Sequence, residues 1–294
     1  MKVGLVGAGA VGQSVGALLV GSGWCQEVLV ASGSEVSAHG LVTDLEDLTQ
    51  VTGSPVRVAV AAPQTMGDCD AVVLSPRAKF TNTAASDVRM AGLAANAPVV
   101  AALARHLTGY PGVAVMVTNP VDILARLFAE VSGCPRVLGV GSATDTARYR
   151  LTLARLLRVP TDAVRGHVIG EHGDTAVICA STTTVHGRPA PVPMQRVRDE
   201  LAARPRRISA GIGRTRSGPA GAVLTALTHA LGLTDGVTEV SMRQDGGVWL
   251  GMPVRYTRGT AALCPPPLDP SEAAQLAAST EKLHTAYTQL DKEI

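Results

Sequence analysis

Two segments in the middle of the sequence carry side chains that can transfer protons and bind anions. Asp145 and Arg148 are three positions apart, so on a helix they lie on one face. His172 lies in the segment Gly170-Glu171-His172-Gly173-Asp174. A histidine beside a carboxylate can act as a general acid or base, and an arginine can hold a carboxylate with two parallel hydrogen bonds. Taken singly, these residues also fit a surface ion pair and a loop histidine without a role.

A third polar segment follows an apolar run that we expect to be a strand. Its sequence is Val117-Thr118-Asn119-Pro120-Val121-Asp122. In a doubly wound sheet, ligands bind outside the carboxyl ends of the strands. We therefore expect Asn119 to contact both a bound cofactor and a substrate, and the alternative is a simple Asn-Pro turn.

A glycine-rich segment near the start of the sequence predicts a dinucleotide site. It follows the apolar run Lys2–Val6 and opens a helical pattern over Val11–Gly21. Glycines in that position let the backbone approach a pyrophosphate, which then sits at the helix N-terminus. The residues expected to contact the dinucleotide are Gly7, Gly9, Ala10, Val11 and Gly12.

The end of the second predicted strand bears on the choice of dinucleotide. An acidic residue at this position normally holds the ribose 2′-hydroxyl of NAD, but the expected position is Ala31. Without a carboxylate, nothing repels a 2′-phosphate, and Ser32, Ser34 and Ser37 can donate hydrogen bonds to one. No arginine lies in this segment to supply a positive charge. The expected cofactor is NAD or NADP, with NADP or relaxed specificity slightly favoured.

Strands that alternate with helices predict the fold of the first half. The expected strands are Lys2–Val6, Glu27–Val30, Val56–Ala61, Ala71–Leu74, Val113–Thr118 and Arg136–Val140, with helices between them such as Val11–Gly21 and Asp87–His106. This alternation is typical of βαβ units and a parallel sheet. We therefore expect an α/β protein whose residues 1–142 form a Rossmann domain with a doubly wound parallel sheet.

The second half has a mixed pattern, which predicts an α+β substrate domain over residues 143–294. The expected helices are Ala143–Leu157, Val197–Arg214, Gly218–Leu231 and Ser271–Leu290. The expected strands are Gly166–Ile169, Ala176–Val185, Val237–Met242 and Val248–Val254, with a hairpin turn around Gly187. The basic cluster 204–207 fits a solvated helix face, and the prolines 265–267 fit a link to the last helix.

Composition excludes several classes of protein. The chain has 294 residues, 46% of them hydrophobic and 17% charged, which is a globular balance. The net charge of +2 and the 3% aromatic content argue against nucleic-acid binding. No apolar run is long enough for a membrane span. The five cysteines are odd in number and form no CxxC pair, so we expect a cytoplasmic protein without a disulfide framework or a metal site.

Together, and in this order and spacing, the GxGxxG, TNPVD, DxxR and GEHGD segments resemble the lactate/malate dehydrogenase family. The resemblance spans nearly the whole chain, and GEHGD is its most specific part, similar to the lactate-type branch. It implies hydride transfer between a nicotinamide cofactor and a 2-oxo or 2-hydroxy acid. It also implies that His172 is the acid/base, that Asp145 holds the imidazole and favours its protonated form, and that Arg148 binds the substrate carboxylate.

The resemblance further implies a second arginine on a mobile loop, which polarises the substrate carbonyl. Arg89 matches it, seven residues before Asn96, and Thr215 matches a pocket threonine. The segment before Arg89 is about four residues longer than is usual in the family, and Pro76 stands where a glycine is usual. The family's substrate selector then falls on Thr83, although the insertion leaves Arg77, Lys79 or Asn82 as alternatives.

The altered segment leaves the substrate open, so we expect an atypical 2-oxo acid. One alternative is the reduction of a different carbonyl compound, such as a phosphonate or a bulky 2-oxo compound, by the same residues. Another is a protein that senses NAD(P)(H) without catalysis. The family also implies a homodimer or a homotetramer.

Overall fold

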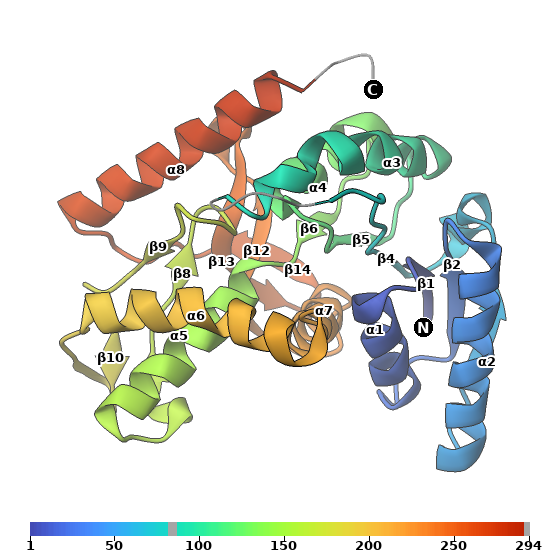
Figure 1. Cartoon of the computed structure of the whole chain (residues 1–294), viewed down its shortest axis with the longest axis horizontal. Coiled ribbons are helices and arrows are strands. Elements are labelled where there is room, and N and C mark those ends of the chain that lie inside the picture. Colours follow the sequence, from blue (N-terminus) through green and yellow to red (C-terminus); the bar gives the residue numbers. More distant parts are fainter. Residues whose placement is uncertain (82–86, 291–294) are drawn as a thin grey trace.

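The computed structural model describes residues 1–81 and 87–290 and contains a nine-stranded central sheet (Figure 1). Six of its strands run parallel in the order β3-β2-β1-β4-β5-β6. They are β1 (Lys2–Val6), β2 (Glu27–Ala31), β3 (Arg57–Val60), β4 (Ala71–Leu74), β5 (Val113–Met116) and β6 (Val137–Gly139). This is the doubly wound order of a Rossmann fold, and it confirms the predicted fold class.

Alternating side chains along these strands build a core on each face of the sheet. Val3 and Leu5 of β1 pack toward α1 (Ala10–Val20), α2 (Glu35–Thr52) and α7 (Ser217–Ala230). Val72 and Leu74 of β4 pack on the other face, toward α3 (Leu93–His106) and α4 (Val121–Ser132). Both faces of the parallel sheet are covered by helices, which explains its continuous runs of buried residues.

Three antiparallel strands from the second half of the chain extend this same sheet. They are β12 (Gly236–Arg243), β13 (Trp249–Thr257) and β14 (Thr260–Leu263), and β12 joins β6 where Ser241 pairs with Gly139. The sequence did not predict β14, which is four exposed residues long. Its hairpin turn is Arg258-Gly259, and both residues have positive φ, as a two-residue turn between twisted strands requires.

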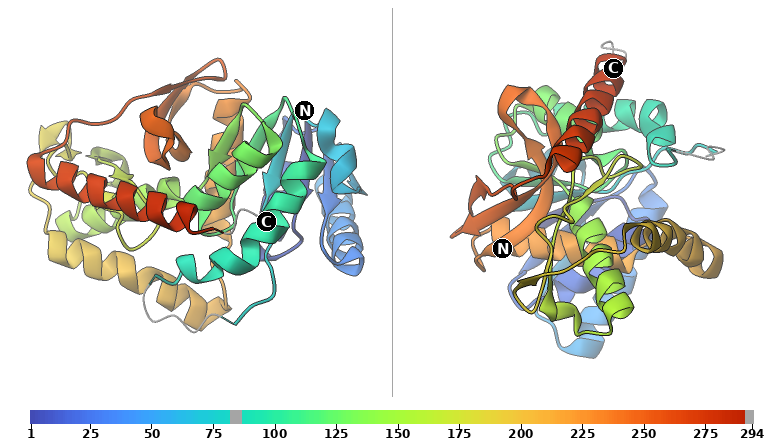
Figure 2. Two further views of the ribbon diagram at one scale, coloured as in Figure 1. Left: turned by 90° about the horizontal axis from the view of Figure 1, so that it is seen from above. Right: turned by 90° about the vertical axis from the view of Figure 1, so that its left-hand side faces the viewer.

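In the second half of the chain, α5 (Ser142–Leu157) packs against β12 and α6 (Met194–Ile212), and α8 (Pro270–Thr288) packs against β13. Figure 2 shows α8, in red, from two further sides. The short strands are β7 (Val164–Arg165), β8 (Val168–Ile169), β9 (Val177–Ile178), β10 (Thr184–Val185) and β11 (Arg188–Pro189), in two small antiparallel sheets. The 3₁₀ helices of the described residues are η1 (Pro63–Asp68), η2 (Met90–Gly92), η3 (Thr161–Ala163) and η4 (Asp245–Gly247).

Two predicted elements were wrong in extent. The strand expected over 176–185 is two strands, because Ser181 between them bonds Glu272 of α8 through its backbone N–H and its hydroxyl. The helix expected from Asp87 begins as an α-helix only at Leu93, since Asp87 itself has a φ of 50°. The boundary at residue 142 stays a prediction, although α5 does begin at Ser142. In the described residues, no helix is both long and apolar enough to cross a membrane.

Candidate active site

His172 is fixed by two carboxylates from different helices. It lies in the loop between β8 and β9, and its backbone N–H donates to Oδ2 of Asp122 at the start of α4, 2.8 Å away. Its Nδ1 lies 2.5 Å from Oδ2 of Asp145 on α5. Both side chains are largely buried, at 10% and 14% exposed. Because Nδ1 is held by Asp145, Nε2 is the imidazole nitrogen left to exchange a proton.

A glycine makes this approach of the imidazole possible. Gly141 is the N-cap of α5, and a Cβ at this position would lie 2.4 Å from Cγ of His172. Any other residue would push the imidazole away from Asp145. The sequence offered no sign of this requirement, since the histidine and the glycine are far apart in the chain.

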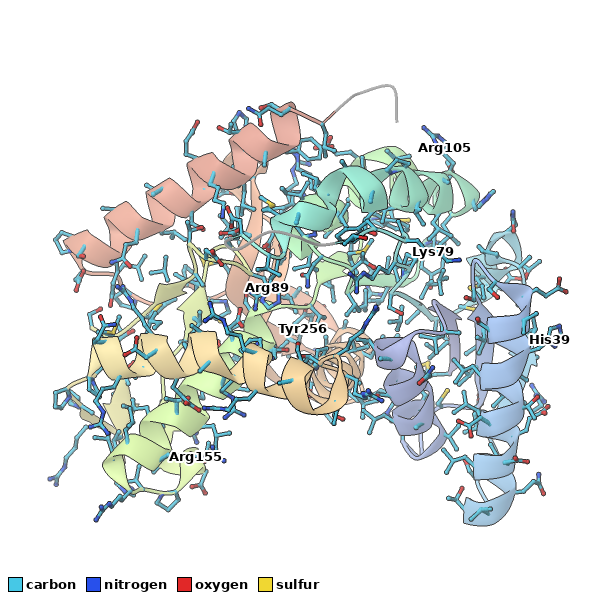
Figure 3. The ribbon with its side chains drawn as sticks, viewed as in Figure 1. His39, Lys79, Arg89, Arg105, Arg155 and Tyr256 are labelled. Carbon is cyan, nitrogen blue, oxygen red and sulfur yellow. The ribbon has the colours of Figure 1, made fainter. Side chains whose placement is uncertain are left out.

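The second carboxylate oxygen of Asp145 faces two guanidinium groups. Oδ1 lies 3.6 Å from Nη1 of Arg148 and 3.8 Å from Nη2 of Arg89. Burial alone would raise the pKa of Asp145, but the neighbouring His172, Arg89 and Arg148 lower it on balance. Figure 3 shows Arg89 near the middle of the molecule, just above α6. The structure therefore places three predicted site residues, His172, Arg148 and Arg89, around the carboxylate of a fourth, Asp145.

Arg148 has an unexpected positive neighbour. Burial lowers the pKa of Arg148, Asp145 opposes this shift, and the positive charges of Arg89 and Arg204 add to it. Arg204 of α6 is only 22% exposed, whereas Arg207 is 58% exposed. The Nε of Arg204 is buried and has no hydrogen-bond partner among the described residues. The expectation of a solvated helix face was therefore wrong for Arg204.

The glycine-rich segment after β1 has room for a ligand at one position only. A Cβ at Gly7 would lie 2.5 Å from the backbone oxygen of Ser75, and one at Gly12 would lie 1.8 Å from that of Gly7. Packing within the protein thus explains these two glycines. Among the described residues, a Cβ at Gly9 would meet nothing within 4 Å. No described side chain caps α1, which begins at Ala10, so its first N–H groups and the open space at Gly9 fit a pyrophosphate.

The segment after β2 presents hydroxyl groups. Ala31 is buried in the core on the α3/α4 face, and its carbonyl oxygen accepts the N–H of Gly7. Ser32 follows as the first residue after β2 with an accessible side chain. Ser34 caps α2, and its Oγ accepts the N–H of Ser37 at 3.3 Å, which leaves its own O–H free to donate.

Asn119 lies at the carboxyl end of β5, as expected. Its backbone oxygen accepts from Nδ2 of Asn96 at 2.9 Å, and Oδ1 of Asn96 accepts the N–H of Ala78. Asn96 thus connects the segment after β4 with the cis peptide Asn119-Pro120. The side-chain Oδ1 of Asn119 is buried without a partner among the described residues, so it can accept from a bound group.

The structure says less about two other predicted site residues, Thr215 and Thr83. Thr215 is half-buried two residues before α7, the helix whose Gly218 faces Thr144 of α5. Thr83 lies outside the described residues. Within the described ranges, no three His, Cys, Asp or Glu side chains gather as a metal site.

Sequence reasoning gave no role to two further residues that contact the site. Asp122 was quoted within a motif, but it holds the backbone of His172 and is almost wholly buried. That burial raises its pKa to about 6. Lys282 of α8 contacts Glu171, the residue before His172, and no motif pointed to it.

A comparison with protein-family models assigns the first half of the chain, which carries the glycine-rich segment, Arg89 and Asn119. Residues 1–141 match the model described as lactate/malate dehydrogenase, NAD binding domain. Residues 1–141 therefore belong to the lactate/malate dehydrogenase family. Among its curated relatives, an L-lactate dehydrogenase of Treponema denticola is 35% identical over 195 residues, 64% of this chain and 59% of the relative. One of Limosilactobacillus reuteri is 33% identical over 192 residues, 64% and 58% of the two chains.

The matched segment thus spans less than two thirds of the length of these curated relatives. Solved structures of the family align over almost all of this chain. The minor L-lactate dehydrogenase of Enterococcus mundtii, in a ligand-bound form, superposes with a TM-score of 0.90 at 25% identity and covers 99% of this chain and 98% of its own. The malate dehydrogenase of Plasmodium falciparum has the same fold, with a TM-score of 0.89, 18% identity and 98% of each chain covered.

Proposed function

We propose that this protein is a nicotinamide-dependent oxidoreductase acting between 2-oxo and 2-hydroxy acids. The observation that carries the proposal is the shared contact of Asp145 with His172, Arg148 and Arg89. One proton-transferring group and two anion-binding groups meet there, at the carboxyl ends of the parallel strands. Relatives named L-lactate dehydrogenase and family structures named lactate and malate dehydrogenase support the reaction class.

In this proposal each side chain has one task. Arg148 binds the substrate carboxylate through its planar guanidinium group, and Arg89 polarises the carbonyl. His172 gives the proton of Nε2 to the carbonyl oxygen in reduction and recovers it in oxidation. Asp145 holds the imidazole in the required tautomer. A nicotinamide cofactor, when bound, supplies or accepts the hydride at the carbonyl carbon, and Gly9, Ala10, Val11 and Asn119 are the residues placed to hold it.

The cofactor is proposed to be NAD or NADP, with NADPH used at least as well as NADH. The side chain of Ala31 is buried, so we assign the ribose-facing position to Ser32. A serine there neither repels a 2′-phosphate nor holds the 2′-hydroxyl with a carboxylate. The hydroxyl of Ser34 supplies a second donor at the same end of α2.

One observation favours a second candidate, the reduction of a carbonyl compound that carries a further anionic group, such as a phosphonate. The positive charges of Arg89 and Arg204 both act on Arg148. Nη1 of Arg204 lies 3.7 Å from Glu200, and its buried Nε has no partner among the described residues. If Arg204 binds this group, Arg204→Gln will raise KM for a substrate with two anionic groups at least about tenfold, the cost of a lost charged hydrogen bond. It will leave KM for a monocarboxylate unchanged. Equal effects on both substrates would contradict this candidate.

The first experiment follows the absorbance of NADH and of NADPH during reaction of the purified protein with a series of carbonyl compounds. The series comprises pyruvate, oxaloacetate, branched and aromatic 2-oxo acids, and 2-oxo phosphonates. We expect rapid oxidation with at least one of them. Tight cofactor binding without oxidation of any of them would favour a sensor instead.

We further propose that the protein forms a homodimer or homotetramer, as the family resemblance implies. Light scattering of the protein as it elutes from a size-exclusion column measures its mass directly.

The five free cysteines, four of them buried, support a reducing compartment such as the cytoplasm.

A further inference from the structure

Lys282 of α8 joins two carboxylates that come from different parts of the chain. Its Nζ lies 2.5 Å from Oδ1 of Asp87 and 3.0 Å from each carboxylate oxygen of Glu171. Lys282 is 23% exposed, and Glu171 is 3% exposed. Burial alone would lower the pKa of Lys282, but the hydrogen bonds to Asp87 and Glu171 raise it, so the lysine is charged in this position.

Each of the two carboxylates is next to a residue of the candidate active site. Asp87 is two positions before Arg89, and Glu171 directly precedes His172. The backbone around them is also fixed, because the N–H of Asp87 donates to Oδ2 of Asp174 and the N–H of Glu171 donates to Oγ of Ser279 on α8. α8 therefore holds the segment of Arg89 and the loop of His172 at a set separation.

We propose that Lys282 is a positioning residue, which keeps Arg89 beside Asp145 by tying Asp87 to Glu171. This inference rests on the proposed function, in which Arg89 acts on the substrate carbonyl. Without the tie, the segment of Arg89 loses its ion pair with α8, and the guanidinium group is held less firmly in its place in the site. A single ammonium group suits this role because it can bind two carboxylates that approach from different directions.

The burial of Glu171 decides which variants give a clean test. Replacing Lys282 leaves a buried carboxylate without its cation, which costs stability. Asp87→Asn avoids this, because it keeps the ion pair between Lys282 and Glu171 and leaves the lysine only an uncharged amide oxygen in place of the second carboxylate. Asparagine also tolerates the positive φ at this position. Lys282→Arg keeps the charge and serves as the conservative rescue, and Lys282→Gln removes the charge.

The experiment measures steady-state kinetics with the 2-oxo acid that the wild-type protein turns over, together with cofactor binding. We expect Asp87→Asn and Lys282→Gln each to lower kcat/KM for the acid at least about tenfold, while Kd for the reduced cofactor changes less than twofold. The double variant should be no worse than the poorer single variant, because both changes break one tie. Lys282→Arg should recover most of the activity.

Glu130→Gln is the matched control. Glu130 of α4 accepts from Tyr287 of the same helix α8, so this variant weakens a polar contact of α8 that does not involve the segment of Arg89. Unchanged kinetics in Asp87→Asn, or an equal loss in Glu130→Gln, would overturn the proposal.

Hydrogen exchange of residues 87–93 in the free protein separates this inference from the proposed function. We expect faster exchange there in Asp87→Asn and wild-type exchange in Glu130→Gln. Hydrogen exchange needs no substrate. It therefore tests whether Lys282 holds this segment even if the wild-type protein turns over no 2-oxo acid. Unchanged exchange in Asp87→Asn would show that the tie does not hold this segment, and would overturn the inference.

Discussion

Asp145 holds His172 with one carboxylate oxygen and turns the other oxygen toward the arginines. Oδ2 meets Nδ1 of the imidazole at 2.5 Å, and Oδ1 lies 3.6 Å from Arg148, one helical turn along α5. The separation between the proton-transferring group and the carboxylate-binding group is therefore set by the geometry of a single helix. The proposed substrate class, in which a carboxylate adjoins a carbonyl group, is built on this arrangement.

His172 is the first residue to replace. We expect His172→Ala to lower kcat by at least about 100-fold, the contribution of a positioned general acid. The fold should persist, because Asp145 keeps its two arginines. Stopped-flow kinetics and cofactor binding measure the two effects, and near-normal turnover would remove His172 from the mechanism.

Arg148→Lys tests the planar contact with the substrate. Lysine keeps the charge but cannot form two parallel hydrogen bonds to a carboxylate. We expect KM for the 2-oxo acid to rise at least about tenfold, as for one lost charged hydrogen bond. Titration of cofactor fluorescence gives the cofactor Kd, which should not move. A change in cofactor affinity alone would assign this arginine to the dinucleotide instead.

Ser32→Asp tests the choice of dinucleotide. A carboxylate after β2 repels a 2′-phosphate and can hold a 2′-hydroxyl group. We expect kcat/KM for NADPH to fall about tenfold relative to NADH, which corresponds to ~1.4 kcal/mol of repulsion. Thr43→Asp, at an exposed position farther along α2, is the control. If the wild-type protein already uses NADH far better than NADPH, the proposed preference is wrong.

Asp122 predicts a pH dependence of stability. Burial raises its pKa from 3.8 to about 6, so the folded protein binds its proton more tightly than the unfolded chain does. The resulting stabilisation is fully present below pH 3.8 and is lost as the pH rises through 6, with a slope of at most about 1.4 kcal/mol per pH unit. Asp122→Asn should remove this slope and keep the bond to the N–H of His172. Denaturant unfolding between these pH values measures it, and an unchanged slope would mean that Asp122 does not titrate there.

The parallel half of the fold could be predicted because its signals are local. The strands Lys2–Val6 and Ala71–Leu74 have the expected bounds, since each is an apolar run that is buried on both faces. The prediction of a single strand over 176–185 was wrong because the deciding contact is not local. The N–H of Ser181 donates to Glu272, which lies 91 positions away in the chain, so no local sequence pattern indicates this contact.

The residues of the candidate site also differ in how far the sequence alone could identify them. Asp145, Arg148 and His172 could be selected because their spacing matches a family motif. Gly141 and Lys282 could not, because their importance lies in the space and charge that the fold brings to them from distant segments. The orientation of Ala31 could not be predicted either. Side chains alternate between the two faces of a strand, so an error of one residue in the strand places an inward side chain outward.

The contact between Lys282 and Glu171 has a consequence for the order of events during synthesis. α8 follows every other described element in the chain, whereas the dinucleotide segment and the parallel strands are made first. A chain emerging from the ribosome therefore contains Arg89 and His172 well before α8 is made. If the proposed tie holds, a nascent chain has its proposed catalytic residues before it has the contact that fixes the place of Arg89.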